Sequence, residues 1–318
     1  MKPQVIALEE HYVDPEVARH FKEGGPESRP GPLRERLEDV AALRIREMDE
    51  AGIDIQVLSH SAPATQRLDA ETAPAIARAA NDRLRERVRA SNGRFEAFAA
   101  LPTANPRAAA DELERAVSKL GFKGAMIHGL TNGKFIDERP FWPIFERAQA
   151  LDVPIYIHPA VPHPAVVEAY YRDYLKDFPG LLTAAWGFTV ETATQGIRLV
   201  LSGVFDEYPG LKIILGHLGE SLPFSLWRID MALGRQGNRK SAFRDTFRSH
   251  FWITTSGNFS TPALLCSVME MGADRILFSV DYPFVPNPPG VRWMDHVPLG
   301  PEDREKILSA NAKRLLKL

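Results

Sequence analysis

Eight short apolar runs recur along the chain, and stretches with a helical period separate them. The runs are Val5–His11, Ile53–His60, Arg94–Pro102, Gly121–Gly129, Val153–Pro159, Leu211–Gly219, His250–Asn258 and Arg275–Pro283. Strands that are nearly continuous in apolar residues are buried on both faces, which is typical of a parallel sheet covered by helices. Eight such units predict a closed (β/α)₈ barrel of the α/β class, with residues 1–318 forming a single domain.

Segments with helical periodicity fill the intervals between the runs. They are Leu33–Ala51, Ala70–Ser91, Pro106–Leu120, Pro140–Leu151, Val190–Phe205, Glu220–Leu233, Thr261–Met271 and Pro301–Lys317. Several begin at Pro or a polar capping residue and end just before Gly, as helix ends do. An open doubly wound sheet is the alternative, but no Gly-x-Gly-x-x-Gly follows any run and the chain has no Walker motif.

Composition excludes several classes of protein. The 318 residues are 44% hydrophobic and 25% charged, and 39 basic minus 41 acidic residues leave a net charge of −2. No basic field therefore exists to hold a nucleic acid or an anionic membrane surface. Cys266 is the single cysteine, which excludes an internal disulfide and a Cys-based zinc site. The longest nearly apolar stretch, Leu181–Val190, is too short for a membrane span, and the first residues lack the pattern of a signal peptide, so we expect a cytoplasmic protein.

Two stretches rich in Pro and Gly follow the first and the last predicted strand. They are Gly24–Pro32 and Pro283–Gly290. Both should lie over the rim where the carboxyl ends of the strands meet, and irregular loops of this length are usually functional.

Ionisable residues close several of the predicted strands. Glu9 and His11 end the first strand two residues apart, so strand alternation points both to one face. His158, His217 and Asp281 end the fifth, sixth and eighth strands. Barrel enzymes build their active sites at these carboxyl ends. Two imidazoles and two carboxylates that converge there can hold one divalent metal, with water or substrate completing its shell.

Each of these residues also has a structural interpretation. A lone His at a strand end is more often a hydrogen-bonded structural residue than a ligand, although four or five strands that end this way favour a site. Glu10 is out of phase and is expected to face the helices as an ion-pair or capping residue, and Glu220 has the rival role of favouring the first turn of the next helix. His60 and His128 end further strands and are candidates for substrate contact, whereas His250 begins a strand and is expected to be structural.

Six segments, spread in order over essentially the whole chain, resemble one family. They are ALEEHY, YIHP, ILGHLGE, WRID, ITTSGNF and LFSVDYP. They resemble the decarboxylase branch of the amidohydrolase superfamily, which includes aminocarboxymuconate semialdehyde decarboxylase. Within that branch the likeness is strongest to the nonoxidative ortho-hydroxybenzoate decarboxylases of the γ-resorcylate and 2,3-dihydroxybenzoate type.

The resemblance implies a carboxy-lyase with a single divalent metal and no organic cofactor. The implied ligands are Glu9, His11, His158 and Asp281. A carboxylate in place of an imidazole hardens the ligand set, which favours Mn²⁺, with Zn²⁺ and Mg²⁺ as alternatives. Lys123 lies early in its strand, where it could not bridge a second metal as a carbamylated lysine does in binuclear relatives.

The implied reaction is the reversible decarboxylation of an ortho-hydroxybenzoate to a phenol and CO₂. The resemblance implies that Asp281 donates a proton to the ring carbon that bears the carboxylate. It also implies that His217, oriented by Glu220, ionises the phenol or stabilises charge. Arg228 corresponds to a position near the substrate, although it equally fits a helix surface. The aromatic residues that could hold the small aromatic carboxylate, or else pack in the core, are Phe21, Trp186, Phe188, Tyr282 and Phe284.

Alternatives stay open on the same barrel. A short loop after the fourth strand and Val285 after the last depart from the resorcylate pattern, so the substitution pattern of the ring is not fixed. A metal-dependent hydrolase, such as a lactonase or amidohydrolase, would use the same ligands with Asp281 as a base toward water. Glu9 in place of a first His disfavours it, and a noncatalytic barrel would not need intact ligands. Relatives of this kind form homodimers or homotetramers, and we expect the same here.

Overall fold

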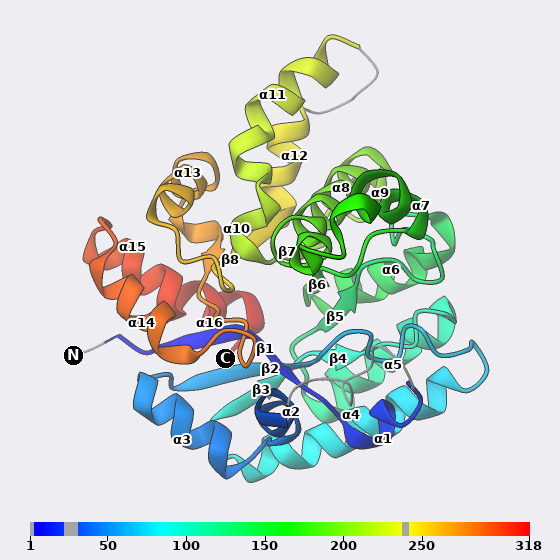
Figure 1. The fold of residues 1–318 in the computed structure, drawn as a ribbon, viewed down its shortest axis with the longest axis vertical. Helices are drawn as coiled ribbons and strands as arrows, with labels where there is room; N and C mark the ends of the chain where they lie inside the picture. The colour runs from blue at the N-terminus through cyan, green and yellow to red at the C-terminus, as the bar shows by residue number, and fades with distance from the viewer. Residues whose placement is uncertain (1–2, 22–30, 237–241) are drawn as a thin grey trace.

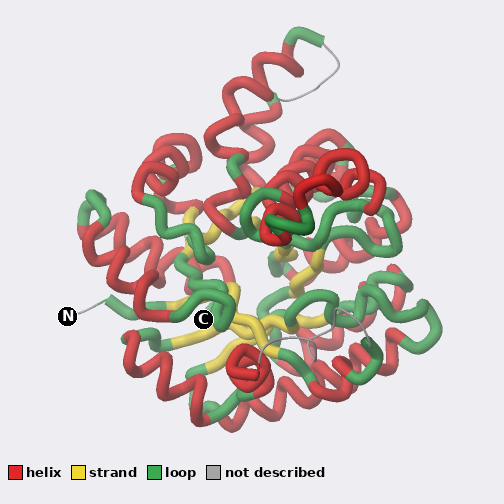
Figure 2. The backbone as a smooth tube through the Cα atoms, viewed as in Figure 1, coloured by secondary structure: helices red, strands yellow, loops and turns green. Residues whose placement is uncertain are grey.

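The structure, a computed structural model, describes residues 3–21, 31–236 and 242–318. Strands gather at its centre and helices surround them (Figures 1 and 2). The strands are β1 Ile6–Tyr12, β2 Ile55–His60, β3 Phe95–Ala97, β4 Ala99–Ala100, β5 Ala125–His128, β6 Ile155–His158, β7 Ile213–Leu215, β8 Phe251–Thr254 and β9 Ile276–Leu277. Every strand pair is parallel, so all carboxyl ends meet at one rim.

The predicted third strand is divided between two ladders, in the orders β1-β2-β3 and β4-β5-β6-β7-β8-β9. β3 pairs with β2 and β4 pairs with β5, so nine short strands correspond to the eight predicted units. Phe98, between the two, still donates its N–H to the carbonyl of Leu58 on β2. On the other side, the N–H of His11 reaches the carbonyl of Tyr282 at 2.7 Å and joins β1 to the chain beyond β9. The ladders together make the predicted barrel.

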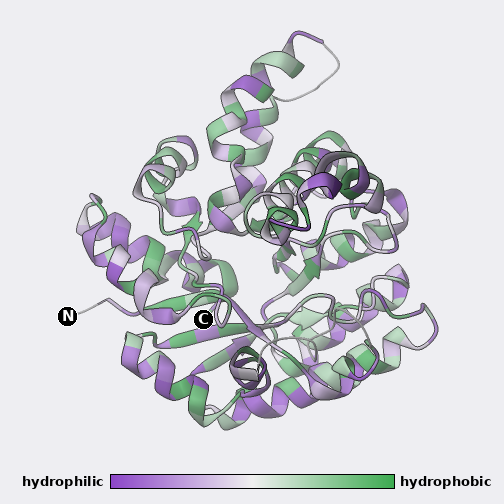
Figure 3. Ribbon diagram, viewed as in Figure 1, coloured by the Kyte–Doolittle hydropathy of each residue, from purple (hydrophilic) through white to green (hydrophobic). Residues whose placement is uncertain are grey.

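Helices cover the outside of the strands. The longer ones are α2 Gly31–Glu38, α3 Ala42–Ala51, α4 Ala73–Ala90, α5 Pro106–Leu120, α6 Trp142–Leu151, α8 Gly187–Leu201, α11 Leu222–Gly234, α12 Phe243–His250, α13 Thr261–Met271 and α14 Asn287–His296. The shorter helices include α1 Pro15–Ala18, α7 Pro164–Val166, α9 Val204–Glu207, α15 Pro301–Glu305 and α16 Asn311–Leu316. Hydrophilic and hydrophobic residues alternate along the outer helices, as helices with one buried face require (Figure 3). None of the described helices is long and apolar enough to cross a membrane.

Several predicted helix boundaries are wrong. The predicted helix over 33–51 breaks at Asp39, whose Oδ1 accepts the N–H groups of Ala41 and Arg44 and so starts a new helix. The helix predicted over 190–205 begins three residues earlier and is interrupted at Gly203, which has a φ of +83°. The whole of α12 was absent from the predicted helices, and His250, predicted to begin a strand, is its last residue.

The prediction of an irregular loop over Pro283–Gly290 is wrong in its second half. α14 begins there at Asn287, with two prolines in its first turn. Proline fits this position because the first N–H groups of a helix have no partner within the helix. Most of the other predicted loop, Gly24–Pro32, lies outside the described residues, which omit 22–30.

Apolar side chains fill the barrel below the rim formed by the carboxyl ends of its strands. Inward-facing residues from successive strands form one cluster with the C-terminal helix α16, and α16 thereby closes the amino-terminal end of the barrel. The members are Ile6, Leu8, Val57, Phe98, Met126, Tyr156, Ile214, Leu277, Ala312, Leu315 and Leu316. A larger cluster packs the outer strand faces against the helices. The barrel interior is therefore apolar toward its amino-terminal end, which leaves the carboxyl ends of the strands for polar side chains.

Candidate metal centre

Four side chains meet at the rim of the barrel: Glu9, His11, His158 and Asp281. Each offers one ligand atom, and these atoms all lie within 4.8 Å of one another. His158 Nε2 is 3.2 Å from Glu9 Oε1, and His11 Nε2 is 3.2 Å from Asp281 Oδ1. The structure thus brings together the four ligands that the resemblance implies, although they come from opposite ends of the sequence.

A bulge in β1 aims Glu9 and His11 at this centre. The pairing of β1 with β2 shifts register between Ala7 and Glu10. Ile6 and Leu8 belong to the barrel interior, so an unbroken alternation would have sent Glu10 inward instead of Glu9. The extra residue of a bulge reverses this phase and re-aims the side chains that follow. Period-2 reasoning from the sequence alone could not locate the bulge.

Partners on the outer nitrogen of each ring orient the two histidines. His11 Nδ1 lies 3.2 Å from Ser59 Oγ, and His158 Nδ1 lies 2.7 Å from the carbonyl oxygen of Pro159. His128 Nδ1 also lies 3.0 Å from His158 Nδ1. A proton on Nδ1 of His158 leaves its Nε2 lone pair free for a metal, which is the usual arrangement in metal sites. No pattern in the sequence pointed to Ser59.

The carboxylate of Glu9 is held through one oxygen only. Its Oε2 accepts hydrogen bonds from the hydroxyls of Tyr156 and Ser256, with Thr254 Oγ1 at 3.4 Å. Its Oε1 is buried and has no hydrogen-bond partner. Hydroxyl side chains at successive positions of the seventh predicted strand, Thr254, Thr255 and Ser256, were the available signal, and sequence reasoning missed it.

Three buried atoms at the centre lack hydrogen-bond partners. They are Glu9 Oε1, His11 Nε2 and Asp281 Oδ1. Unpaired buried polar atoms are costly, and two carboxylates beside each other increase the cost. A divalent cation would satisfy all three at once, so the residues fit a metal ion of the kind predicted.

The electrostatics keep these groups in metal-binding form. Burial opposes ionisation of Glu9, but the nearby His217, His158 and His11 outweigh it and lower the pKa of the carboxyl. Burial likewise opposes ionisation of Asp281, but the adjacent rings of His11 and His217 outweigh it and lower the pKa of this carboxyl. Burial lowers the pKa of His11, which favours the neutral imidazole that binds metals.

His217 and Glu220 form a bonded pair beside the cluster. His217 Nδ1 is 2.6 Å from Glu220 Oε1, and its Nε2 is 3.8 Å from Asp281 Oδ2. Burial alone would lower the pKa of His217, but the attraction of Glu220 and Glu9 raises it well above its ordinary value. The imidazolium is therefore the favoured form, and its Nε2 faces both Asp281 and Glu9 Oε1, the latter at 3.6 Å.

The backbone that carries this pair is strained. Five consecutive residues, 217–221, have positive φ: 51° at His217, 57° at Leu218, 75° at Gly219, 53° at Glu220 and 63° at Ser221. Left-handed conformations cost free energy at non-glycine residues and cluster at functional sites. The helix predicted from Glu220 therefore begins two residues later, at Leu222. Glu220 binds His217 instead of serving only as an acidic residue in the first turn of that helix.

Glu10 points to the other side of β1 and holds the chain around Asp281. Its carboxylate accepts the N–H groups of Val280 at 2.9 Å and Tyr282 at 3.2 Å, and Ser279 Oγ lies 3.3 Å away. Asp281 itself has a φ of +72°. Glu10 thus accepts backbone N–H groups of the chain after β9, whereas the predicted role was to cap a helix or form an ion pair. The predicted ion pair is not found among the described residues, and burial raises the pKa of Glu10 to about 8.

The predicted substrate-contact residues are not all at the cluster. The Phe284 ring lies 5.5 Å from the ring of His11, centre to centre. Trp186 is half exposed just before α8, and Phe21 is partly exposed after α1. Arg228 is exposed on α11, and within the part of the chain that the structure describes it contacts none of the four cluster residues.

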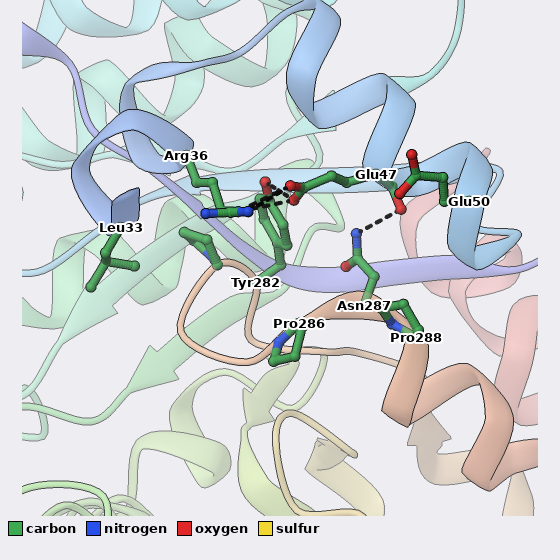
Figure 4. Close-up of a pocket in the computed structure, with 9 residues that line it drawn as sticks. Leu33, Arg36, Glu47, Glu50, Tyr282, Pro286, Asn287 and Pro288 are labelled. Carbon is green, nitrogen blue, oxygen red and sulfur yellow. Dashed lines mark hydrogen bonds and ion pairs between the residues drawn. The ribbon is translucent and has the colours of Figure 1, made fainter. Parts of the chain in front are cut away.

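Tyr282 does not line the mouth of the barrel as predicted. It is buried, and its hydroxyl donates to Glu47 Oε2 at 2.7 Å on the helix side of β1. Arg36 binds the same carboxylate at 3.0 Å, and the three residues line a cavity under α14 (Figure 4). The Tyr282 side chain is turned away from the metal centre, because both its backbone N–H and its hydroxyl have acceptors on the helix side of β1.

The two further histidines have structural bonds. His60 Nε2 accepts the N–H of Asp14, and its Nδ1 lies 2.8 Å from the carbonyl oxygen of Ser61. His128 lies behind His158, and its Nε2 is 2.8 Å from the carbonyl oxygen of His60. Burial lowers the pKa of His128 well below its ordinary value, so the ring is neutral.

A parallel barrel that brings two carboxylates and two imidazoles together at the carboxyl ends of its strands defines a metal-dependent barrel protein with one metal site. The chain belongs to the amidohydrolase family, because the family model described as Amidohydrolase matches residues 11–318.

Similar proteins of known activity span the whole chain. A γ-resorcylate decarboxylase from Polaromonas sp. (strain JS666) is 42% identical over an alignment of 325 positions, which covers 98% of each chain. The crystal structure of a dihydroxybenzoic acid decarboxylase from the same organism, with bound manganese and the inhibitor 2-nitroresorcinol, has a TM-score of 0.91 and 42% identity over 99% of this chain and 97% of that one. A 2,6-dihydroxybenzoate decarboxylase complexed with 2,6-dihydroxybenzoate has a TM-score of 0.90 and 41% identity over 99% and 100%.

Proposed function

We propose that this protein is a metal-dependent nonoxidative decarboxylase of an ortho-hydroxybenzoate, a carboxy-lyase that releases a phenol and CO₂. The observation that carries the proposal is the convergence of three unpartnered buried atoms, on Glu9, His11 and Asp281, at the rim of the barrel. Full-length similarity to γ-resorcylate and 2,6-dihydroxybenzoate decarboxylases supports the reaction. Those relatives are not hydrolases, so they lend no support to the hydrolase alternative.

Glu9, His11, His158 and Asp281 would hold the metal, and manganese is the ion found in a similar structure. When bound, a divalent ion supplies the positive charge that fixes the substrate carboxylate and its ortho oxygen. Two carboxylates among four ligands make the set harder than an all-His site, which suits Mn²⁺. Zn²⁺ and Mg²⁺ are the alternatives that the sequence leaves.

The proton for the ring comes from Asp281 in this proposal, and His217 supplies it. His217 Nε2 lies 3.8 Å from Asp281 Oδ2, while Glu220 holds the opposite nitrogen. Proton transfer from Asp281 to the carbon that bears the carboxylate interrupts aromaticity. The bond between that carbon and the carboxylate then breaks, its electron pair restores the ring, and CO₂ leaves. The balance requires no oxidant and no organic cofactor.

Turnover followed by ultraviolet absorbance tests the proposed function. Manganese-loaded protein would be offered 2,6-dihydroxybenzoate, 2,3-dihydroxybenzoate, salicylate and 5-carboxyvanillate, with metal analysis of the same sample. We expect release of CO₂ and of the matching phenol from at least one of them. Metal-loaded protein that is inert toward all four and opens lactones would establish the hydrolase instead.

The proposed assembly is a homodimer or homotetramer. α11 projects from the barrel together with α12 (Figure 1) and exposes Phe224 by 84% and Trp227 by 61%. Large exposed apolar side chains on a projecting helix are typical of a protein interface. Sedimentation of the wild type and of Phe224→Ser tests this, because a polar residue at the interface should weaken association and leave the barrel folded. A wild type that sediments as a monomer would contradict the assembly.

A further inference from the structure

Arg44 is among the largest side chains that are fully buried, and the proposed reaction does not use it. It lies on α3, and its relative exposure is 0%. A buried guanidinium is costly unless its charge and its five N–H donors are satisfied. Among the described residues, its hydrogen bonds end on neutral acceptors and not on a carboxylate. Its position must therefore be explained by what those acceptors are.

One of these acceptors belongs to a metal-ligand residue. The Nη2 group of Arg44 donates to the carbonyl oxygen of His11 at 2.5 Å and to the carbonyl oxygen of Arg36 at 3.1 Å. The N–H of His11 donates in turn to the carbonyl of Tyr282 at 2.7 Å. The residue after Tyr282 is Pro283, which has no N–H with which a further bond of this ladder could be made. Because Arg44 supplies a donor, both peptide groups that flank His11 are held.

The other contacts of the guanidinium fix Arg44 itself. Its Nε donates to the carbonyl oxygen of Asp39 at 3.1 Å, at the break between α2 and α3. Its guanidinium carbon lies 4.7 Å from the centre of the Tyr282 ring. The planar fork of arginine can satisfy several acceptors in one fixed geometry, which the compact charge of a lysine cannot. The guanidinium is therefore a rigid support between these helices and the end of β1.

Gln56 joins Arg44 to Glu10, which holds the chain around Asp281. Gln56 Oε1 accepts from Arg44 Nη1 at 3.2 Å, and Gln56 Nε2 lies 3.4 Å from Glu10 Oε2. Gln56 is fully buried on β2. An amide suits this position because it can accept from a cation and donate to a carboxyl oxygen at the same time. One bonded chain thus runs behind β1 from the backbone of His11 to the backbone on either side of Asp281.

We propose that Arg44 is a positioning residue of the metal centre. It fixes His11 through the carbonyl oxygen of that residue, and it supports Asp281 through Gln56 and Glu10. The inference deepens the proposed function, and it rests on the metal site and not on the substrate. Partners behind metal ligands set the orientation of those ligands, and their loss typically weakens metal binding or activity by about 10- to 100-fold. Manganese affinity therefore tests the role of Arg44 whether or not any hydroxybenzoate turns over.

Arg44→Lys is the test variant, because it keeps the positive charge and removes the planar fork. In a titration with Mn²⁺, with the free ion counted by its electron paramagnetic resonance signal, the dissociation constant should be about tenfold higher than in the wild type. The spectrum of the bound ion should also change, since it depends on the geometry of the ligands. Arg46→Lys is the matched control on the exposed face of the same helix, where Arg46 lies 3.9 Å from Glu50. It should leave the affinity and the spectrum unchanged.

Urea unfolding of the metal-free proteins separates positioning from support of the fold alone. A lower free energy of unfolding in Arg44→Lys, together with the wild-type manganese affinity and spectrum, would overturn the proposal. A wild type that binds no manganese would overturn it as well, along with the metal site itself. If Arg44→Lys does not fold, Gln56→Met decides, because it keeps the side-chain length and removes the link to Glu10. Weaker manganese binding in Gln56→Met would uphold the bonded chain, and equal binding would refute it.

Discussion

Asp281 faces two groups at once, and both are needed for the proposed proton transfer. One of its oxygens lies 3.2 Å from His11 Nε2 and the other lies 3.8 Å from His217 Nε2. Asp281→Asn replaces the acid by an amide that cannot supply a proton, so we expect kcat to fall by about a thousandfold, within the range for general acid catalysis. Circular dichroism and the thermal midpoint should show a folded protein. Near-normal turnover in this variant would remove Asp281 from its role.

Glu10 lies on the other side of β1 from the metal centre and acts on Asp281 as a positioning residue. Its carboxylate accepts N–H groups from both neighbours of Asp281, which itself adopts a left-handed conformation. Glu10→Gln turns an NH₂ group toward these donors and leaves a buried N–H without an acceptor, at a cost of about 1–3 kcal/mol in stability. We expect kcat to fall by about tenfold and manganese to bind more weakly, because a displacement of Asp281 changes both.

The control for this prediction is Glu86→Gln, on the exposed face of α4, which should change none of these quantities. Titration of manganese and measurement of kcat and KM separate a positioning role from a purely structural one. A less stable Glu10→Gln protein that keeps the wild-type kcat and manganese affinity would show that the bonds only support the fold.

At the scale of elements, the sequence predicts the strands well and predicts poorly the backbone irregularities that orient the site residues. Charged residues at strand ends could be placed at one rim because all carboxyl ends of a parallel barrel meet there. The bulge in β1 and the left-handed segment 217–221 could not be predicted, because tertiary contacts impose them against local preference. Glu10 was therefore predicted to face away from the site but without its partners, and the prediction of Tyr282 at the barrel mouth was wrong.

α8 carries a further buried acid, Glu191, and its raised pKa predicts that the stability of the protein depends on pH. Glu191 is 6% exposed and its Oε1 has no hydrogen-bond partner. Burial raises its pKa from 4.5 to about 7, although Arg198 opposes the shift. A raised carboxyl pKa favours the protonated form in the folded state. This stabilisation is complete below about pH 4.5 and is lost as the pH rises through about 7.

Glu191→Gln should remove this dependence, since the amide is neutral throughout. Between pH 5 and 8, we expect the wild type to lose roughly 1–2 kcal/mol of unfolding free energy relative to the variant. Urea unfolding at both ends of this range measures the difference, with Glu86→Gln as an exposed control. Parallel stability profiles for wild type and Glu191→Gln would show that Glu191 stays ionised in the folded protein.

At the scale of the whole molecule, periodicity predicts the barrel because eight apolar runs leave few other ways to bury themselves. It does not predict what projects from the barrel. α12 and α14 were absent from the expected helices, and the exposed apolar side chains of α11 have no signature that separates them from core residues. Packing against the barrel, or against a second copy, decides the position of such elements, and a sequence pattern does not contain that information.

The metal should link the two ends of the chain and so stabilise the whole fold. Glu9 and His11 come from the first strand and Asp281 follows the last, so a shared cation would bridge the seam where β1 meets the chain beyond β9. Manganese at about 100 times its dissociation constant should raise the free energy of unfolding by about 2.7 kcal/mol, if it binds only the folded state. A chelator should reverse the gain. Glu9→Gln removes one charged ligand and should reduce the stabilisation by manganese. Identical unfolding transitions of the wild type with and without manganese would contradict a metal site at this seam.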